Sequence, residues 1–328
     1  MNIIFLKSEV LPNELKELRD EFPQYEFFSP QDIESTPLEL LKVKYWDYVE
    51  VLYGDNFAIQ ELSTAHQLRW VHSPSPHMGQ VCLDEIYERK NILLTKTAEP
   101  NRTQISEFAI TGILSLGKQL FHWHDSSVEG SKLWGSPPER ESTWMMKGRL
   151  LLQVGLGTVG SSIADLGQKM GMRVWGVAHH RTFHSYCHKT FSPQELHSIL
   201  PVADIVSLCL PKDKSYKNWF GQSELELMKN DSILVIISPS GVVDIDLLGK
   251  VAESGKFRGI LLDHPQNFTL PKNSPLKDLP NVICTPDVAS CPRSTERMGF
   301  RTFRHNLRQY VHGNFAEMKN LMGKTLSS

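Results

Sequence analysis

The chain has 328 residues, of which 40% are hydrophobic and 22% charged, and this is enough to build two domains with separate cores. Its formal net charge of -2 and its lack of any basic run argue against a surface built for nucleic acid. No apolar run approaches the roughly 20 residues that span a bilayer, and the opening "MNIIFLKSEVL" predicts a first strand rather than a signal peptide.

The cysteines indicate a reducing environment. The chain has 5 of them, scattered along its length, and no two form a C-x-x-C pair. This pattern favours free thiols over a disulfide framework or a zinc site. We therefore expect a soluble, cytoplasmic protein. The cysteines are Cys82, Cys187, Cys209, Cys284 and Cys291.

Short apolar segments alternate with amphipathic ones through the N-terminal third of the chain. This alternation predicts a parallel sheet covered by helices on both faces. A long helix is predicted next, over residues 103–125, because apolar residues recur there at helical spacing. The predicted strands of this part span residues 2–6, 48–54, 68–73 and 91–97, and the amphipathic stretches include residues 11–22 and 78–89.

The same alternation resumes after Gly148. The strand segments are apolar almost throughout, which is typical of strands buried on both faces of a parallel sheet. A final helix is predicted over residues 293–312. The whole pattern predicts an α/β fold with two doubly wound parallel-sheet domains. The predicted strands of this part span residues 150–154, 173–178, 204–210, 232–238, 259–263 and 282–285.

A glycine-rich turn directly follows the strand predicted at residues 150–154. Gly155, Gly157 and Gly160 form a G-x-G-x-x-G pattern in "LLLQVGLGTVGSSIADLGQKMGMRVWGV", before a helical pattern and a second strand. Glycines there allow a tight turn, close approach of the backbone to a pyrophosphate, and close packing of helix on strand. The helix N-terminus adds N–H donors. The pattern predicts a Rossmann domain that binds NAD or NADP; the alternative is a glycine-rich turn without a ligand.

The residues after the second strand bear on the choice of cofactor. An NAD site usually has an acid at this position to hold the ribose hydroxyls. Here the position is Ala178, followed by His179, His180 and Arg181. No carboxylate would repel a 2′-phosphate, and three side chains could receive one, so the sequence slightly favours NADP over NAD. The alternative is a solvated basic turn.

Further stretches occur in a recognisable order: "NRTQISEF", the glycine turn, "ADIVSLCLP", "SELELMKNDSILVIISPSGVVDIDLL" and "LPNVICTPDVAS". Together they resemble the D-isomer-specific 2-hydroxyacid dehydrogenases, which include glyoxylate/hydroxypyruvate reductases and D-glycerate and D-lactate dehydrogenases. The resemblance implies a flavodoxin-like substrate domain over residues 1–100, completed by the C-terminal helix segment 290–328. It implies an NAD(P)-binding domain over residues 101–289, an active cleft between the two domains, and a homodimer.

On the cofactor side, the resemblance implies that most positions are kept. Thr158 and Val159 match the loop amides on the pyrophosphate, and residues 210–211 match the wall beside the adenosine. Asp263 matches the acid that faces the nicotinamide carboxamide, whereas Tyr216 stands where the family usually has threonine. The cofactor-binding residues expected in this way are Gly155, Gly157, Thr158, Val159, Gly160, His179, His180, Arg181, Leu210, Pro211, Ser238 and Asp263.

The catalytic side is changed. Members of the family use an arginine in "N-T-A-R-G" to bind the substrate carboxylate, a glutamate in "D-V-F-E-x-E-P", and a histidine that the glutamate holds. The matching positions here are Ser240, Phe268 and Asp287. The substrate loop is matched by residues 76–79, and Pro76 has no N–H to offer a carboxylate. A general acid is typically worth about 10²–10⁴ in rate, and a carbonyl-polarising donor about 10²–10³.

These replacements predict an NAD(P)-binding protein that resembles a 2-hydroxyacid dehydrogenase but lacks its keto-acid reductase activity, as a pseudoenzyme or a cofactor-dependent interaction protein. The alternative is a working NAD(P)-dependent oxidoreductase with a rebuilt site for an unusual carbonyl or hydroxyl substrate. In that case Asp287, His77 or His264 would supply the proton. The expected partners are the dinucleotide, a small-molecule ligand and a second copy of the chain, with no nucleic acid and no membrane.

Histidines at every fourth position raise the question of a metal site. His180, His184 and His188 have this spacing, which would place them on one face of a helix. Their segment follows a predicted strand, where a loop is expected instead. The sequence therefore predicts no metal.

Overall fold

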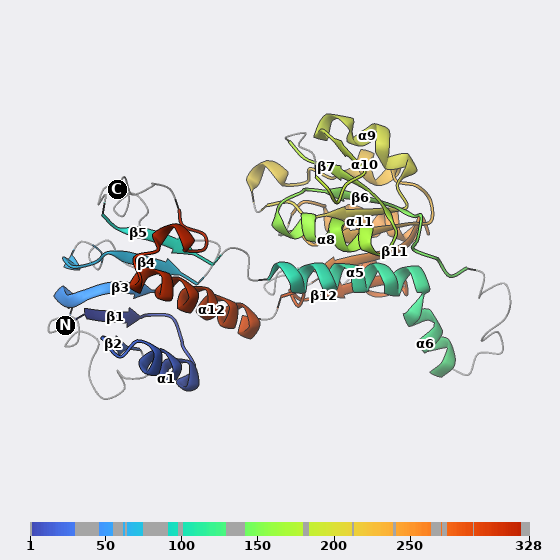
Figure 1. Ribbon diagram of the computed structural model, residues 1–328. Coiled ribbons are helices and arrows are strands. Elements are labelled where there is room, and N and C mark those ends of the chain that lie inside the picture. Colours follow the sequence, from blue (N-terminus) through green and yellow to red (C-terminus); the bar gives the residue numbers. More distant parts are fainter. Residues whose placement is uncertain are drawn as a thin grey trace. The chain divides into compact units, whose positions relative to one another are not determined.

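The computed structural model divides the chain into two compact units. Unit 1 comprises Met1–Pro100 and Pro292–Ser328, and unit 2 comprises Asn101–Cys291. Each unit is an α/β structure built on one parallel sheet (Figure 1). The residues that the structure describes are 2–29, 46–54, 62, 64–74, 91–97, 101–128, 142–179, 184–211, 213–238, 241–263, 270, 274–290 and 292–322.

Unit 1 contains a 5-stranded sheet in the order β2-β1-β3-β4-β5. This is the strand order of flavodoxin-like doubly wound sheets. The helices α1 (Pro12–Glu21) and α12 (Pro292–Val311) contribute Leu18 and Phe303 to the core on one face, and a second core covers the other face. The strands are β1 (Asn2–Leu6), β2 (Tyr25–Phe28), β3 (Val49–Tyr53), β4 (Trp70–Ser73) and β5 (Leu93–Lys96).

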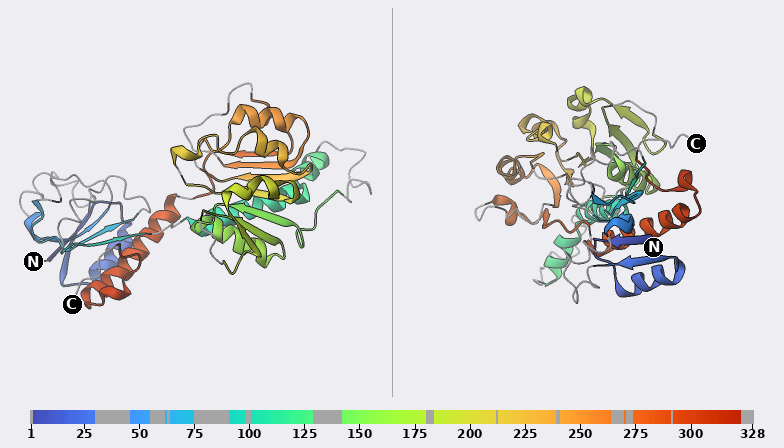
Figure 2. Two further views of the ribbon diagram at one scale, coloured as in Figure 1. Left: turned by 90° about the horizontal axis from the view of Figure 1, so that it is seen from above. Right: turned by 90° about the vertical axis from the view of Figure 1, so that its left-hand side faces the viewer.

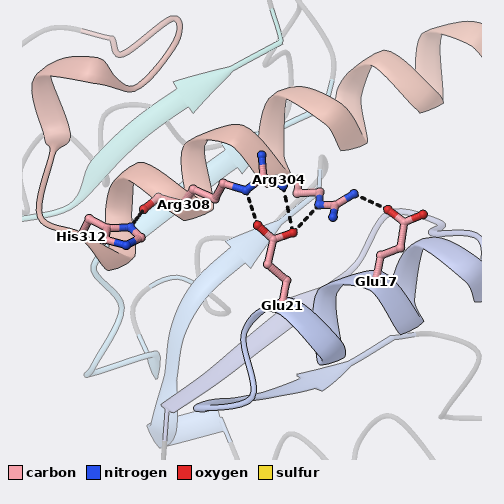
Figure 3. Close-up of polar contacts among 5 residues, drawn as sticks. All are labelled: Glu17, Glu21, Arg304, Arg308 and His312. Atoms are coloured by element: carbon pink, nitrogen blue, oxygen red, sulfur yellow. Dashed lines mark hydrogen bonds and ion pairs between the residues drawn. The ribbon is translucent and has the colours of Figure 1, made fainter.

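Charged side chains join α1 to α12, as Figure 3 shows. Arg304 pairs with Glu17 and donates from Nε to Glu21 Oε2 at 2.6 Å, while Arg308 donates from Nη2 to the same oxygen at 3.0 Å. His312 donates from Nδ1 to the backbone carbonyl of Arg308. Burial alone would raise the pKa of Glu21, but the hydrogen bonds from Arg308 and Arg304 outweigh it and hold this pKa below its usual value. The last helix of the chain is thereby fixed to the first.

A fully buried histidine lies on β4. His72 is 0% exposed, with Nδ1 at 2.6 Å from Thr95 Oγ1 and Nε2 at 3.2 Å from Thr97 Oγ1. Trp70 Nε1 also donates to Thr95 Oγ1, at 2.9 Å, and the Tyr53 ring stacks on the imidazole. Burial lowers the pKa of His72 to about 3, so the ring is neutral at pH 7. Its hydrogen bonds are therefore those of a neutral imidazole, with one donor and one acceptor nitrogen.

Unit 2 contains a 7-stranded sheet in the order β12-β11-β10-β9-β6-β7-β8. Its first strand, β6, lies inside the sheet, and the strand order reverses between β6 and β9. Ligands of open α/β sheets bind at the carboxyl ends of the strands at such a point. The strands are β6 (Leu150–Val154), β7 (Arg173–Val177), β8 (Lys189–Phe191), β9 (Ile205–Leu208), β10 (Ser232–Ile236), β11 (Phe257–Asp263) and β12 (Val282–Thr285).

Helices cover both faces of this sheet (Figure 2). One core contains residues of α5 (Arg102–Lys118) and α8 (Thr158–Lys169). The core on the other face contains residues of α9 (Leu196–Ile199), α10 (Gln222–Leu227) and α11 (Ile245–Glu253). The molecule therefore has the predicted α/β fold, with two doubly wound parallel sheets.

The structure differs from the sequence prediction in one long helix and two short strands. The helix predicted over residues 103–125 is two helices, α5 and α6 (Leu120–Val128). Gln119 separates them with a left-handed φ of 54°, and its N–H caps the carbonyl of Leu116. The unpredicted strands, β2 and β8, are both edge strands with few buried residues, so they lack the continuous apolar pattern of the inner strands.

Two negative findings apply to the described residues. No helix among them is both long and apolar enough to cross a membrane. Nowhere in the described ranges do three or more His, Cys, Asp or Glu side chains gather in a way that could hold a metal ion.

Candidate functional site

The three glycines after β6 each meet a different spatial requirement. Gly155 has a φ of +90°, and a Cβ there would lie 2.1 Å from the carbonyl oxygen of Cys209. A Cβ at Gly160 would lie 2.0 Å from the carbonyl oxygen of Gly155, so α8 can approach the turn only without a side chain there. Gly157, the N-cap of α8, is different, because no described atom lies within 4 Å of its Cβ position. This open space suits a pyrophosphate that approaches the backbone.

Backbone donors of the same turn are free to bind an anion. The N–H of Gly155 is used, since it donates to the carbonyl of Val177 on β7 at 2.9 Å. The next four N–H groups, from residues 156–159, have no acceptor among the described residues. They include the predicted Thr158 and Val159 and belong to the turn and the first turn of α8, where the helix dipole adds partial positive charge. The turn that we call the dinucleotide turn, residues 155–160, therefore fits a pyrophosphate.

A hydrogen bond links the two loops that flank β6. His179 follows β7, and Tyr216 lies in η5 (Lys214–Tyr216) after β9; the distance from His179 Nε2 to Tyr216 Oη is 2.8 Å. His179 is exposed, whereas Tyr216 is half-buried and packs edge-on against Trp219. Since β7 and β9 are the neighbours of β6, this pair spans the carboxyl end of β6. That is the region where the sequence predicts contacts to the adenosine ribose.

Ser238 connects the ends of β9 and β10. Its hydroxyl group is buried and accepts the N–H of Leu210 at 2.9 Å. Leu210 is itself buried, while the following Pro211 is exposed. Ser238 thus fixes the backbone at Leu210. The predicted contacts of Leu210, Pro211 and Ser238 with a cofactor stay predictions.

Asp263 ends β11 and fastens the turn that follows β12. One carboxylate oxygen accepts the Thr285 hydroxyl at 2.7 Å and the Val288 N–H at 3.0 Å, and the other accepts the Ala289 N–H at 2.9 Å. The side chain is 8% exposed. A carboxylate can accept about four hydrogen bonds, so the second oxygen retains room for one more donor, such as a carboxamide. The clamping role of Asp263 has no signal in the sequence, because its partners follow a different strand.

Asp287 lies within the turn that Asp263 fastens. Its φ is 55°, in the left-handed region, and its side chain is exposed. Burial, with a smaller contribution from the negative charge of Asp263, raises the pKa of Asp287 above its usual value. Asp, Asn and His are the residues most often found in this backbone region apart from glycine. The backbone at this position therefore suits aspartate as well as histidine.

Several predicted site residues lie outside the described residues. These are His77, His180, Arg181, Ser240, His264 and Phe268, together with the predicted substrate loop at residues 76–79. Two other histidines of the four-residue series have separate partners: His184 Nδ1 bonds Tyr186, and His188 Nδ1 accepts the N–H of Val174.

Three further residues surround the dinucleotide turn and were not identified from the sequence. Gln153, 0% exposed, donates from Nε2 to the carbonyl of Gly155, and Ser161 donates to that of Leu156. Tyr186 in turn donates to Ser161. Only Gln153 offers a signal in the sequence, because it is the one polar residue of the strand "LLLQV".

The comparisons with known proteins agree with this geometry. Residues 110–289, more than half of the chain, match the sequence model described as "D-isomer specific 2-hydroxyacid dehydrogenase, NAD binding domain". The chain therefore belongs to the D-isomer-specific 2-hydroxyacid dehydrogenase family, and its NAD-binding domain contains the dinucleotide turn.

Similar proteins cover nearly the whole chain. It is 27% identical over 316 residues to a glyoxylate reductase of Aeropyrum pernix, which covers 94% of this chain and 93% of that protein. Among solved structures, the NAD-complexed D-isomer specific 2-hydroxyacid dehydrogenase of Lactobacillus delbrueckii ssp. bulgaricus has a TM-score of 0.75 at 18% identity, covering 98% of this chain and 100% of that chain. The acyclic imino acid reductase Bsp5, in complex with NADPH and D-Arg, has a TM-score of 0.68 at 16% identity, with 98% and 100% covered.

Proposed function

We propose that this protein binds a nicotinamide dinucleotide but does not reduce 2-keto acids by the mechanism of its family. The observation that carries the second part is Asp287, at the position that the resemblance assigns to the proton-transferring histidine. Its side chain is exposed, and the negative charge of Asp263 contributes to raising the pKa of its carboxyl group. When ionised it repels an anionic substrate, and Ser240 and Phe268 replace the arginine and glutamate. The protein would then act as a cofactor-dependent interaction protein or pseudoenzyme.

The proposed cofactor is NADP in preference to NAD. The dinucleotide, when bound, supplies or accepts the hydride, and the N–H groups of residues 156–159 would hold its pyrophosphate. Ala178 leaves no acid at the end of β7, and the exposed His179 follows at the position that the resemblance places near the adenosine ribose. Solved relatives of the same fold were obtained with NAD and with NADPH, so the fold accommodates either one. Replacing Arg181 by alanine should weaken NADPH more than NADH.

A direct assay tests the proposal. Calorimetry should show binding of NADPH and NADH, whereas glyoxylate, hydroxypyruvate and pyruvate should give no protein-dependent oxidation of either. Asp287→His alone should leave this unchanged, because groups that act as a unit are not restored one at a time. Robust turnover of these keto acids that Asp287→Asn abolishes would overturn the proposal and make Asp287 the working acid.

One observation favours a second candidate, an active oxidoreductase with a rebuilt site. Burial and Asp263 raise the pKa of Asp287, which shifts its carboxyl toward the protonated form that a general acid needs. Such a site would suit a substrate without negative charge. A screen of neutral aldehydes, ketones and imines with NADPH tests it: turnover that falls at least tenfold in Asp287→Asn supports this candidate, and no turnover rejects it.

The same proposal includes a homodimer in a reducing, cytoplasmic environment. Cys187, Cys209 and Cys284 form no disulfide bond in the described part of the chain. Burial raises the pKa of Cys187 to about 11, which keeps it unreactive. Light scattering at several protein concentrations should give the mass of two chains.

A further inference from the structure

Four side-chain and backbone groups form a continuous line of hydrogen bonds that begins at a carbonyl of the dinucleotide turn and leads away from it. Ser161 Oγ lies 2.9 Å from the carbonyl oxygen of Leu156, and Tyr186 Oη lies 2.6 Å from Ser161 Oγ. His184 Nδ1 lies 2.7 Å from Tyr186 Oη. The line thus runs from the middle of the turn, through α8, to the segment between β7 and β8.

The carbonyl at one end sets the direction of every bond in this line. The oxygen of Leu156 can only accept, so the hydroxyl hydrogen of Ser161 points to it. Tyr186 must then donate to Ser161, and His184 must carry its hydrogen on Nδ1 to donate to Tyr186. Within this line, each of the three hydrogens, on Ser161, Tyr186 and His184, therefore has one acceptor. The line therefore fixes the direction of the Leu156 carbonyl, and the N–H of Gly157, on the same trans peptide, points the opposite way.

The segment that carries Tyr186 is itself fixed. Its Ser185 carbonyl accepts a hydrogen bond from Gln168 of α8 at 3.3 Å, and His188 accepts the N–H of Val174 on β7 at 3.0 Å. The side chain of Leu156 lies over Gly176 of β7, where an added Cβ would be 2.6 Å from Leu156 Cδ1. Tyr186 is thus held in place from two elements and can in turn hold the dinucleotide turn.

The preceding carbonyl of the turn is also held by a side chain. Gln153 Nε2 donates to the oxygen of Gly155 at 3.2 Å. Two successive carbonyls, those of Gly155 and Leu156, are therefore bound by side chains, while the N–H groups that follow have no acceptor among the described residues. A peptide flip in this turn would place a carbonyl oxygen where a phosphate oxygen binds, and like partial charges would then repel.

We propose that Tyr186 is a positioning residue for the dinucleotide. Through Ser161 it keeps the Leu156 carbonyl turned away from the pyrophosphate, so that the N–H groups of the turn are oriented before the ligand arrives. The inference rests on the dinucleotide binding proposed above. Losing one neutral hydrogen bond of this kind should weaken binding about five- to tenfold.

Matched variants of one helix position separate this role from packing. Ser161→Thr keeps the hydroxyl, while Ser161→Val has nearly the same shape without it. Calorimetry with NADPH should give a Kd for Ser161→Val and Tyr186→Phe about five- to tenfold above that of the natural protein, and a Kd for Ser161→Thr within about twofold. The double variant Ser161→Val/Tyr186→Phe should bind no worse than Ser161→Val, because both changes break one line.

The neighbouring Ser162 provides the control. Its hydroxyl donates to Ser106 of α5 at 3.0 Å, away from the turn, so Ser162→Val should leave the Kd unchanged. Equal losses in Ser161→Thr and Ser161→Val, or a Tyr186→Phe variant that melts earlier but binds normally, would overturn the inference. If the natural protein binds neither NADPH nor NADH, the proposed function itself fails and the inference falls with it.

Discussion

The carboxyl ends of β6 and of β11 and β12 lie on the same edge of one parallel sheet, yet they match the pattern expected from the family resemblance to different degrees. After β6, the dinucleotide turn retains three glycines whose Cβ positions meet either a carbonyl or open space. After β11 and β12, Asp263 is present, but Asp287 stands in place of the histidine that the family resemblance implies. The first region depends on backbone shape and the second on side-chain chemistry.

The two regions differ in how strongly local packing restricts the residue type. At the dinucleotide turn, a Cβ at Gly155 or Gly160 would clash with a backbone oxygen, so packing requires glycine at both positions whether or not a ligand binds. At Asp287, the left-handed φ of 55° accepts aspartate as readily as histidine, and Asp263 holds the turn through backbone N–H groups of residues 288–289. The turn can therefore keep the same shape with either aspartate or histidine at this position.

The largest effects should come from adding a methyl group to the turn glycines. Gly160→Ala would put a Cβ 2.0 Å from a backbone oxygen, which cannot move aside cheaply, and should cost about 3 kcal/mol or more of unfolding free energy. Gly157→Ala should melt like the natural protein, because nothing described lies within 4 Å of that Cβ, yet bind dinucleotide at least tenfold more weakly. Thermal melts and calorimetry check both. Normal dinucleotide binding by the Gly157→Ala variant would show that the open space at Gly157 is not needed by the pyrophosphate.

A buried histidine in unit 1 should make the protein sensitive to acid independently of Asp287 in unit 2. Burial lowers the pKa of His72, in unit 1, to about 3 from its ordinary value of 6.5. Between these values the unfolded chain binds one more proton than the folded one, so stability is full above pH 6.5 and falls as the pH drops. The slope should be about 1.4 kcal/mol per pH unit. Urea unfolding from pH 7.5 to 5 should show this slope in the natural protein. In His72→Gln the slope should be smaller by about 1.4 kcal/mol per pH unit, the contribution of one proton. An unchanged slope would place the acid-sensitive group elsewhere.

The next largest effect should come from removing the charge of Asp263, which holds the turn after β12. Asp263→Asn removes a charged acceptor from two backbone N–H groups and should cost about 1–3 kcal/mol of stability. It also removes a negative charge near Asp287, so the pKa of Asp287 should fall toward its usual value, although the contribution of burial remains. Because the raised pKa means that the folded protein binds the proton more tightly, this part of the stability is present at low pH and lost as the pH rises. Carboxyl NMR titration of both proteins measures the change. A pKa of Asp287 that stays the same would show that the two acids do not interact.

The sequence predicts features that have a strong local pattern and misses those that depend on contacts made only in the folded chain. The inner strands and the dinucleotide turn produce strong local patterns, because buried strands are apolar throughout and the turn needs glycine at fixed spacing. The edge strands β2 and β8 escape prediction, since their sequences, "YEFF" and "KTF", are short and interrupted by charged residues. The line from Leu156 through Ser161 and Tyr186 to His184 also escapes, because these residues are ordinary in type and meet only in the folded chain. The clamp at Asp263 is hidden for the same reason, as its partners lie on the next strand.

The smallest predicted effect concerns Gln153, where stability and binding should separate. Its Nε2 holds the Gly155 carbonyl, but its Oε1 is buried and has no hydrogen-bond partner among the described residues. A buried unpaired carbonyl is costly, so Gln153→Met, which removes both polar atoms at similar volume, should change the unfolding free energy by less than about 1 kcal/mol or raise it. The same change frees the Gly155 carbonyl and should weaken NADPH binding about threefold to fivefold. Urea unfolding and calorimetry on one preparation test both halves. A variant that loses stability and keeps its affinity would mean that Gln153 serves the sheet rather than the dinucleotide turn.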